Sequence, residues 1–181
     1  MFWSPLEDTS TVLLTAVPDL PIADQEIHAS MSRIAFQHDE LGAHALCNLD
    51  ERQRLQLLHI DKAESGGAIA AIVPLGLEGF DRLEALFRFL AALHQRPVPA
   101  DRRLTSQQRT RARRMLQAWD GARDGATQRE LAEVVFHHVP LGRDEWQASS
   151  SRYAVMALLR DARRMIAGDY RTLLRHRRRS L

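Results

Sequence analysis

The sequence is poor in cysteine and has no long apolar run. Cys47 is the single cysteine among 181 residues, so the chain cannot form an internal disulfide or a structural zinc site built on thiolates. Charged residues make up 27%, and no apolar stretch approaches the roughly 20 residues of a bilayer span, which excludes an integral membrane protein. The N-terminal residues also lack the basic and apolar regions of an export signal. We therefore expect a cytoplasmic protein.

Recognisable catalytic motifs are missing as well. The sequence has no Gly-rich phosphate loop, no nucleophile elbow and no His-Glu zinc motif. Nothing marks a general base for the three serines at 149–151. His137 and His138 are adjacent and point apart at a helix end, with no further ligand at metal-binding spacing. We expect no enzyme activity, no metal and no cofactor.

Lysine is almost absent, and arginine carries nearly all of the positive charge. Lys62 stands beside 24 arginines, a preference that by itself says little about phosphate binding. The position of the charges is more informative. Residues 1–100 hold seven basic and fourteen acidic groups, or −7, whereas residues 101–181 hold eighteen and nine, or +9, although the formal sum is only +2. This split indicates two modules, one of which meets a polyanion.

Apolar residues before residue 76 alternate at period two, which is typical of strands. Turn-like segments separate the alternating runs, and the apolar run 68–73 suits a central strand that ends at Pro74. Cys47 falls on the inward face and is expected to be a small core residue. These patterns predict a small antiparallel sheet. The alternating residues are Val12, Leu14 and Ala16; Ile34 and Phe36; Ala45, Cys47 and Leu49; and Leu55, Leu57 and His59.

The apolar period changes to three and four residues over 80–93, which predicts one amphipathic helix covering the sheet. Its expected buried stripe is Leu83, Leu86, Phe87, Leu90 and Leu93. The following segment, residues 95–100, contains two prolines and is the best linker candidate. We therefore expect an acidic sheet-and-helix domain over residues 1–96 and a basic domain over residues 97–181.

Two capping boxes predict the first two helices of the basic domain. Thr105 with Gln108 opens a helix whose apolar stripe is Ala112, Met115, Leu116 and Trp119. Thr127 with Glu130 opens a short helix with Leu131, Val134 and Val135 on its buried face, which stops by Pro140. Residues 138–148 are interpreted as an ordered turn.

The serines at 149–151 offer an N-cap for a long helix that runs to about Ile166. Gly168 is placed to end it, and Asp169 can cap a last short helix. Trp119, Trp146 and Tyr170 are expected to be core anchors rather than platforms for base stacking. The predicted fold class is α+β, a sheet with one helix followed by an all-α bundle of the helix-turn-helix kind.

In the helix-turn-helix plan the third helix, here residues 150–166, enters the major groove of duplex DNA. Its N-terminal side chains meet base edges, and arginines farther along and in the tail meet phosphates. Any one arginine also fits a solvated helix face, and Met156 fits packing as well as a thymine methyl or a protein partner. The expected DNA-contacting residues are Thr127, Gln128, Arg129, Ser150, Ser151, Arg152, Tyr153, Met156, Arg160, Arg163, Arg175, Arg177 and Arg178.

Several stretches resemble the proteobacterial family catalogued as domain of unknown function 2285. They are residues 2–5 (FWSP), 127–132 (TQRELA), Trp146 with 149–152 (SSSR), and 167–174 (AGDYRTLL). The resemblance covers about residues 100–178 and is weaker in the sheet half. The chain departs from the family at Gly168-Asp169, where a glycine pair is common, and at Phe136-His137, where Phe-Gly is common.

The resemblance implies a variant helix-turn-helix domain. Characterised relatives include an activator of excision and conjugative transfer of integrative elements, and a small antiactivator that binds it. We therefore expect an activator-like, DNA-binding transcription regulator of mobile-element or conjugative-transfer genes, with the N-terminal domain engaging a protein partner or a second subunit. The alternative is an antiactivator-like module that binds a regulator and not DNA.

Overall fold

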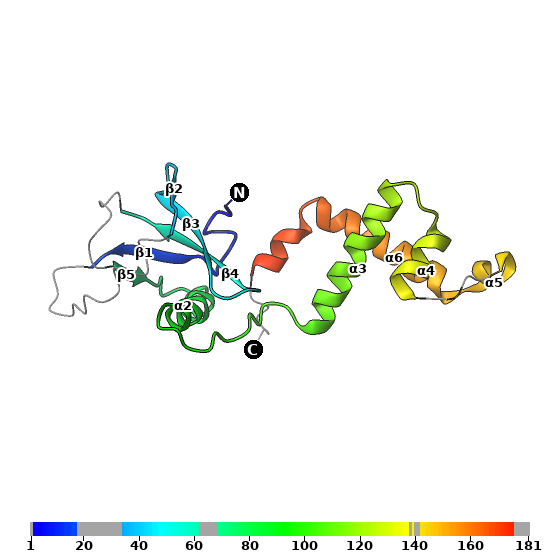
Figure 1. Cartoon of the computed structure of the whole chain (residues 1–181). Helices are drawn as coiled ribbons and strands as arrows, with labels where there is room; N and C mark the ends of the chain where they lie inside the picture. The colour runs from blue at the N-terminus through cyan, green and yellow to red at the C-terminus, as the bar shows by residue number, and fades with distance from the viewer. Residues whose placement is uncertain (1, 18–33, 62–68, 138, 140–141, 176–181) are drawn as a thin grey trace. The chain divides into compact units, whose positions relative to one another are not determined.

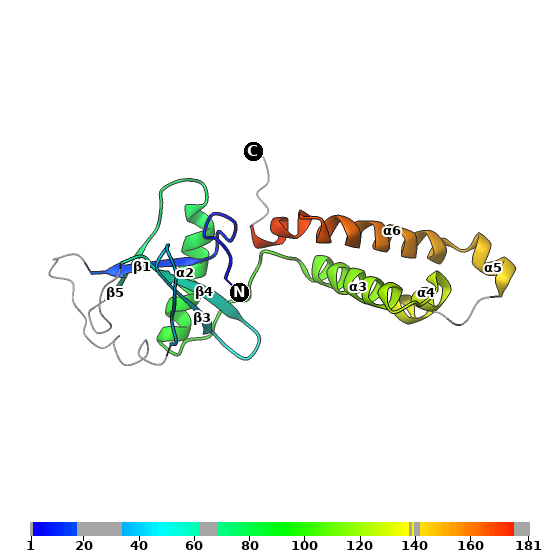
Figure 2. The same cartoon turned by 90° about the horizontal axis from the view of Figure 1, so that it is seen from above.

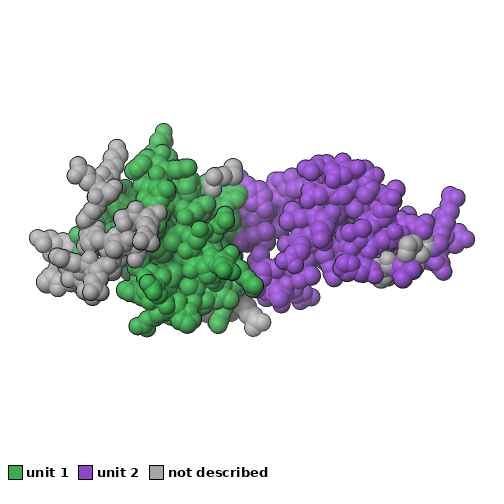
Figure 3. Space-filling view, in the orientation of Figure 1, with its two compact units in different colours: residues 1–103, 174–181 green, residues 104–173 purple. Residues whose placement is uncertain are grey.

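The computed structural model describes residues 2–17, 34–61, 69–137, 139 and 142–175 (Figure 1). The chain divides into two compact units, which are residues 1–103 with 174–181 (unit 1) and residues 104–173 (unit 2) (Figure 3). Unit 1 contains a β-sheet with one helix and unit 2 is helical, so the expected α+β class is confirmed. The domain boundary expected between residues 96 and 97 stays a prediction.

Unit 1 is built on a sheet that has five strands within the described residues. Their order is β2-β3-β4-β1-β5. All ladders are antiparallel except that between β1 and β4, which is parallel and pairs Val12 with Leu57. The strands are β1 (Val12–Ala16), β2 (Gln37–His38), β3 (Ala43–Asn48), β4 (Arg54–His59) and β5 (Ile69–Ile72).

The expectation that the apolar run 68–73 forms a central strand is wrong. Strand β5 lies at the edge of the sheet and pairs with β1. The central position belongs to β4, whose residues 55–58 are all buried. The parallel pairing of β1 beside β4 places β1 between β4 and β5, an arrangement that hairpin spacing alone does not predict.

Helix α2 (Gly79–Leu93) covers one face of the sheet (Figures 1 and 2). Its Ala85 and Phe89 pack with Leu14 and Leu57 in a buried apolar cluster, and Cys47 packs half-buried against that cluster. Removing such side chains from water supplies the main stabilising term of a small domain. The expected stripe is partly wrong, because three of its members are exposed, namely Leu83, Phe87 and Leu90.

Buried arginines explain why α2 turns another face inward. Arg82 donates to the carbonyl oxygens of Thr11 (2.7 Å) and Pro5 (2.8 Å). Thr9 donates to the carboxylate of Asp81 at 2.6 Å. Buried charged groups need such partners, and these partners come from the N-terminal segment that precedes β1. The polar side of α2 is therefore the side that is anchored to the rest of unit 1.

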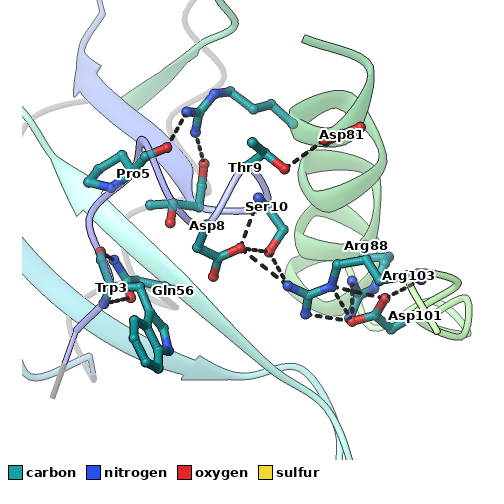
Figure 4. A network of polar contacts seen from close by, with 12 residues as sticks. Trp3, Pro5, Asp8, Thr9, Ser10, Gln56, Asp81, Arg88, Asp101 and Arg103 are labelled. Carbon is teal, nitrogen blue, oxygen red and sulfur yellow. Dashed lines mark hydrogen bonds and ion pairs between the residues drawn. The ribbon is translucent and has the colours of Figure 1, made fainter. Parts of the chain in front are cut away.

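A second part of this network joins residues 101–103 to the N-terminal segment and to α2, all within unit 1 (Figure 4). Arg103 donates to Asp101 (2.6 Å) and to Asp8 (3.2 Å). Arg88, which is almost fully buried, donates to Gln53 at 2.9 Å and lies 3.6 Å from Asp101. Burial opposes ionisation of Asp101, but the Arg103 hydrogen bonds outweigh it and hold the pKa of Asp101 below its usual value.

Unit 2 contains four α-helices and one 3-10 helix within the described residues. The expected caps are confirmed, because Thr105 forms a capping box with Gln108, Thr127 forms one with Glu130, and Ser149 caps the long helix. The helices are α3 (Ser106–Arg123), α4 (Gln128–Phe136), α5 (Arg143–Ala148), α6 (Ser150–Ile166) and the 3-10 helix η2 (Asp169–Leu174).

The core of unit 2 joins α3, α4 and α6. Its buried members include Met115, Ala118, Leu131, Val135 and Val155. Trp119 and Trp146 pack half-buried against this core, as expected for anchors. The structure corrects two of the expected core positions, since Leu116 and Val134 are exposed. Each lies at the margin of its apolar stripe, where the period of apolar residues does not determine which side chains are buried.

Helix α5 is an addition to the predicted elements. It lies between α4 and α6, in the segment expected to be only a turn. The N–H of Gly142 donates to the Glu145 carboxylate at 2.9 Å, and this bond opens the helix. Among the described residues, no helix is both long enough and apolar enough to cross a membrane.

Candidate nucleic-acid interface

Helix α6 has one face in the core of unit 2 and one face in solvent. Val155, Leu158, Leu159 and Ala162 are buried and recur at three- and four-residue steps. The helix lies beside α3 in both views (Figures 1 and 2). Ser149 fixes its start by accepting a hydrogen bond from the Ser151 N–H at 3.0 Å. The opposite face of α6 is therefore held rigidly at the surface.

The exposed face of α6 brings together four of the expected DNA-contacting residues. Tyr153 is 65% exposed and Met156 is 46% exposed. Arg160 and Arg163 follow on the same side, at the helical spacing of three and four residues, and both are exposed. We call these four residues the α6 stripe. It combines two positive charges with an aromatic and a thioether side chain.

The start of α6 contributes unequally to this surface. Ser150 is exposed and Arg152 is half-buried. Ser151 is only 8% exposed because it lies on the inward face with Val155. The Ser151 side chain is therefore not accessible for the expected DNA contact. Its structural role is to donate its N–H to the cap at Ser149.

Acidic neighbours reduce the positive charge at some of these arginines. Asp161 accepts a hydrogen bond from Arg111 of α3 at 2.5 Å, and its other oxygen lies 3.5 Å from Arg160. The Arg111 hydrogen bond is the main reason why the pKa of Asp161 lies below its usual value. Two guanidinium groups thus share one carboxylate and leave one positive charge. Arg164 lies 3.3 Å from Asp169.

Arg152 and Arg163 differ from these paired arginines. Neither forms an ion pair or a hydrogen bond with another side chain in the part of the chain that the structure describes. A guanidinium with no internal partner keeps all five donors for a ligand. Planar bidentate binding of phosphate is a preferred use of such a group.

The N-terminus of α4 holds the other expected contacts. The Thr127 hydroxyl accepts from the Glu130 N–H at 3.3 Å and donates to the Glu130 carboxylate at 2.8 Å. The Thr127 N–H bond to that carboxylate is the first cause of the lowered pKa of Glu130. Gln128 is exposed, and Arg129 lies 3.4 Å from Glu133. Thr127 is thus occupied by capping, and Arg129 is partly neutralised.

The C-terminal arginines are not part of unit 2. Arg175 donates to the carbonyl oxygen of Leu6 at 2.8 Å within unit 1. Arg177 and Arg178 lie outside the described residues. Residues 104–173 carry twelve arginines and eight carboxylates, an excess of four positive charges. The other five charges of the basic half belong to residues 101–103 and 174–181.

Three described positions in unit 2 have a positive φ, namely Gly125, His137 and Gly168, and the last two end the helices α4 and α6. Gly168 has φ +136° and follows the end of α6, where an L side chain would be strained. His137 has φ 55° and ends α4 in the left-handed region. This is the position at which the sequence departs from the Phe-Gly pair. Histidine therefore adopts the conformation that glycine supplies at lower energy.

The contact of Arg111 with α6 is not predictable from the sequence, because no short-range pattern links two residues 50 positions apart. Helix α5 was also not predicted, although the Gly142–Glu145 spacing was an available signal. His137 is exposed, and His138 lies outside the described residues. Within the described part of the chain, no group of three or more potential metal ligands occurs.

The family model described as T6SS, transcription factor, DNA binding domain (RovC type) matches residues 72–175. This range begins at the last residue of β5 and contains α2 and all of unit 2. No curated protein and no solved structure matches the chain.

Proposed function

The chain belongs to the family of T6SS transcription factor DNA-binding domains, and on this basis we propose that it is a transcription regulator that reads duplex DNA with α6. The observation that carries the proposal is the α6 stripe, an exposed basic helix face within the matched range. Its rigid placement against α3 and α4 suits a helix that enters a groove. In this proposal α4, α5 and α6 form a helix-turn-helix variant in which the short helix α5 is added between the other two.

The roles of the side chains follow from their position along α6. Ser150, Arg152 and Tyr153 lie at the N-terminal end, which is the end nearest the base edges in this kind of docking. Met156 is placed to contact a thymine methyl, the apolar mark of the major groove. Arg160 and Arg163 lie one to two turns farther along and bind phosphates. Arg152 is the residue most suited to a guanine edge.

The N-terminus of α4 makes a supporting contact with the DNA backbone. The N–H groups of Gln128 and Arg129 are not used by the capping box, and together with the helix dipole they favour a phosphate there. Gln128 and Arg129 flank that point and add donors. Thr127 acts by holding the helix end in place. Arg175, Arg177 and Arg178 supply further phosphate contacts in this proposal.

The regulated genes and the sign of regulation are finer parts of the proposal. The resemblance to regulators of integrative elements supports mobile-element or conjugative-transfer genes and an activating role. The family description supports T6SS promoters as the second set to examine. A reporter fused to each promoter class, with and without the protein, measures both properties. Increased expression from a transfer-gene promoter supports the first set, and increased expression only from a T6SS promoter contradicts it.

The second candidate function is an antiactivator-like module that binds a regulator. The exposed Tyr153 and Met156 support it, because aromatic and methionine side chains are common at protein interfaces. DNA binding and protein binding make different predictions for salt. Phosphate contacts release counterions, so affinity for DNA falls steeply as salt rises.

Fluorescence anisotropy with the purified full chain tests the proposal. A labelled 30-base-pair duplex is titrated at about 50 and 200 mM salt, conditions between which six or more phosphate contacts change affinity by about a thousandfold. Saturable binding with this salt dependence is the expected result. Absence of binding at both salt concentrations by a folded protein contradicts DNA binding and favours the antiactivator-like alternative.

A further inference from the structure

Helix α2 presents an entirely apolar face to solvent. Phe80, Leu83, Phe87 and Leu90 are 72%, 51%, 63% and 41% exposed. They follow one another at three- and four-residue steps and so form a single stripe, which we call the α2 face. The charged residues Asp81, Arg82 and Arg88 are buried on the other side of the helix.

The sequence just before the helix extends this apolar surface. Leu75 is 99% exposed and Leu77 is also exposed. Together the six side chains expose an area on the order of the 800 Å² that each partner contributes to a standard interface. The largest apolar patch of a typical monomer is smaller, roughly 300–600 Å². The exposed apolar area is therefore close to the area that one partner of a standard interface buries.

The spacing of the α2 face is the same in both directions. The steps between its residues are three, four and three, so the pattern is centred on Ala85. If two such helices pack antiparallel about a twofold axis at that level, Phe80 meets Leu90 of the other copy. Leu83 then meets Phe87 of the other copy. Each phenylalanine is opposite a leucine, which pairs a larger with a smaller side chain and lets the two faces interdigitate.

We propose that two copies of this chain associate through their α2 faces, antiparallel and about a twofold axis. A twofold interface uses the same patch on both partners and must therefore be complementary to itself. The α2 face meets this requirement in spacing, and together with Leu75 and Leu77 it approaches the required size. It also carries no charge, so the pairing of identical surfaces brings no like charges together. An interface with a different protein does not require the spacing of the apolar residues to be the same in both directions, so this symmetry favours a second copy of the chain as the partner.

The dimer gives the chain two copies of unit 2. A twofold arrangement of DNA-binding units reads two half-sites in inverted orientation. This consequence rests on the proposed function, whereas the dimer itself does not. The association is therefore measured without DNA, so that a failure of DNA binding and a failure of dimer formation give separate results.

Sedimentation velocity of the full chain tests the association. The expected result is a dimer at micromolar concentration and a monomer for the double variant Leu83→Glu/Phe87→Glu. The control is Leu116→Glu, since Leu116 is a leucine on α3 that is 62% exposed, and this variant stays dimeric. Circular dichroism of each variant verifies that it is folded. A wild-type monomer at about 100 μM, or a dimer that persists in the folded double variant, overturns the proposal.

Disulfide formation tests the antiparallel register independently. Cys47 is replaced by Ala in all chains, so that the introduced cysteine is the single thiol. A Leu83→Cys chain is mixed with a Phe87→Cys chain, left to exchange subunits and oxidised. The expected product is a cross-linked dimer that forms much faster in the mixture than in either variant alone. Equal rates in all three samples overturn the register. Slow thiol labelling of a monomeric Leu83→Cys chain shows that another part of the same chain covers the face, which overturns the dimer.

Discussion

The guanidinium of Arg111 on α3 lies 2.5 Å from the carboxylate of Asp161 on α6, and the same carboxylate lies 3.5 Å from Arg160. This bridge joins the two longest helices of unit 2 at the edge of the α6 stripe. It has two opposite effects on the proposed interface. The carboxylate holds α6 in place against α3, and it also removes positive potential from the proposed DNA-binding surface.

Asp161→Asn separates these effects. Because Arg111 lowers the folded-state pKa of Asp161, the bridge stabilises the protein above the unfolded pKa, and this contribution is lost as the pH falls through the folded pKa. The free energy of unfolding of the variant is expected to be lower than that of the wild type by up to about 1 kcal/mol at pH 7, which is typical of exposed ion pairs. The difference is expected to be smaller below about pH 4. Urea unfolding at both pH values measures the difference.

The same variant is expected to bind duplex DNA several-fold more tightly at low salt, since it removes a negative charge beside Arg160. Asp144→Asn on α5 is the charge-matched control. Weaker DNA binding by folded Asp161→Asn contradicts the placement of the interface on this side of α6.

Arg88→Ala is expected to destabilise unit 1 by about 2–4 kcal/mol. The substitution removes an almost fully buried guanidinium and leaves Gln53 and the half-buried Asp101 with fewer partners. Arg96→Ala, at an exposed position after α2, is the control and is expected to change stability by less than about 0.5 kcal/mol. Thermal unfolding of the two variants measures the difference, and equal midpoints contradict the role of the network.

Gln95→Gly is expected to stabilise the protein by up to about 1 kcal/mol. Gln95 follows α2 with φ 53°, and the Arg96 N–H closes a bond of 2.7 Å to the Ala91 carbonyl around it. Glycine adopts this backbone conformation without strain, whereas Gln95→Ala keeps a Cβ and is expected to stay near wild type. Chemical unfolding of both variants measures the effect, and a less stable glycine variant shows that the left-handed turn does not carry strain.

Thr127→Ala is expected to cost about 1 kcal/mol, because it removes the hydroxyl that caps α4. Thr127→Ser keeps the hydroxyl and is expected to retain most of the stability. Urea unfolding compares the two. If Ala and Ser variants bind DNA equally well once folded, the hydroxyl acts in capping and not in contacting DNA.

Local patterns in the sequence predicted much of unit 2. Capping boxes involve residues three positions apart, and the apolar period involves steps of three and four residues. Both patterns can therefore be recognised within a short stretch of sequence. Thr105, Thr127 and Ser149 were therefore identified as helix starts, and Gly168 as an end. Helix α5 is too short for its apolar pattern to distinguish it from a turn.

The features that could not be predicted depend on contacts between residues far apart in the sequence. The orientation of α2 depends on hydrogen bonds from Arg82 to residues 71 and 77 positions away. As a result, the apolar stripe that the sequence period predicts to be buried is largely exposed to solvent. The place of β5 depends on the parallel pairing of β1 with β4. In the candidate interface, the helix was predictable from its cap and period. The buried side of Ser151 and the Arg111–Asp161 bridge depend on packing between helices.

Comparison of two double variants tests most directly whether the α6 stripe meets DNA. Arg160→Ala/Arg163→Ala removes two charges from the stripe. Arg109→Ala/Arg113→Ala removes two from exposed positions of α3 that lie off its buried face with Met115 and Ala118. Anisotropy titrations over a range of salt are expected to show about tenfold or greater loss of affinity and a salt slope smaller by about two for the first variant, with little change for the second. Equal loss in both, or unchanged binding by folded Arg160→Ala/Arg163→Ala, contradicts DNA reading by α6.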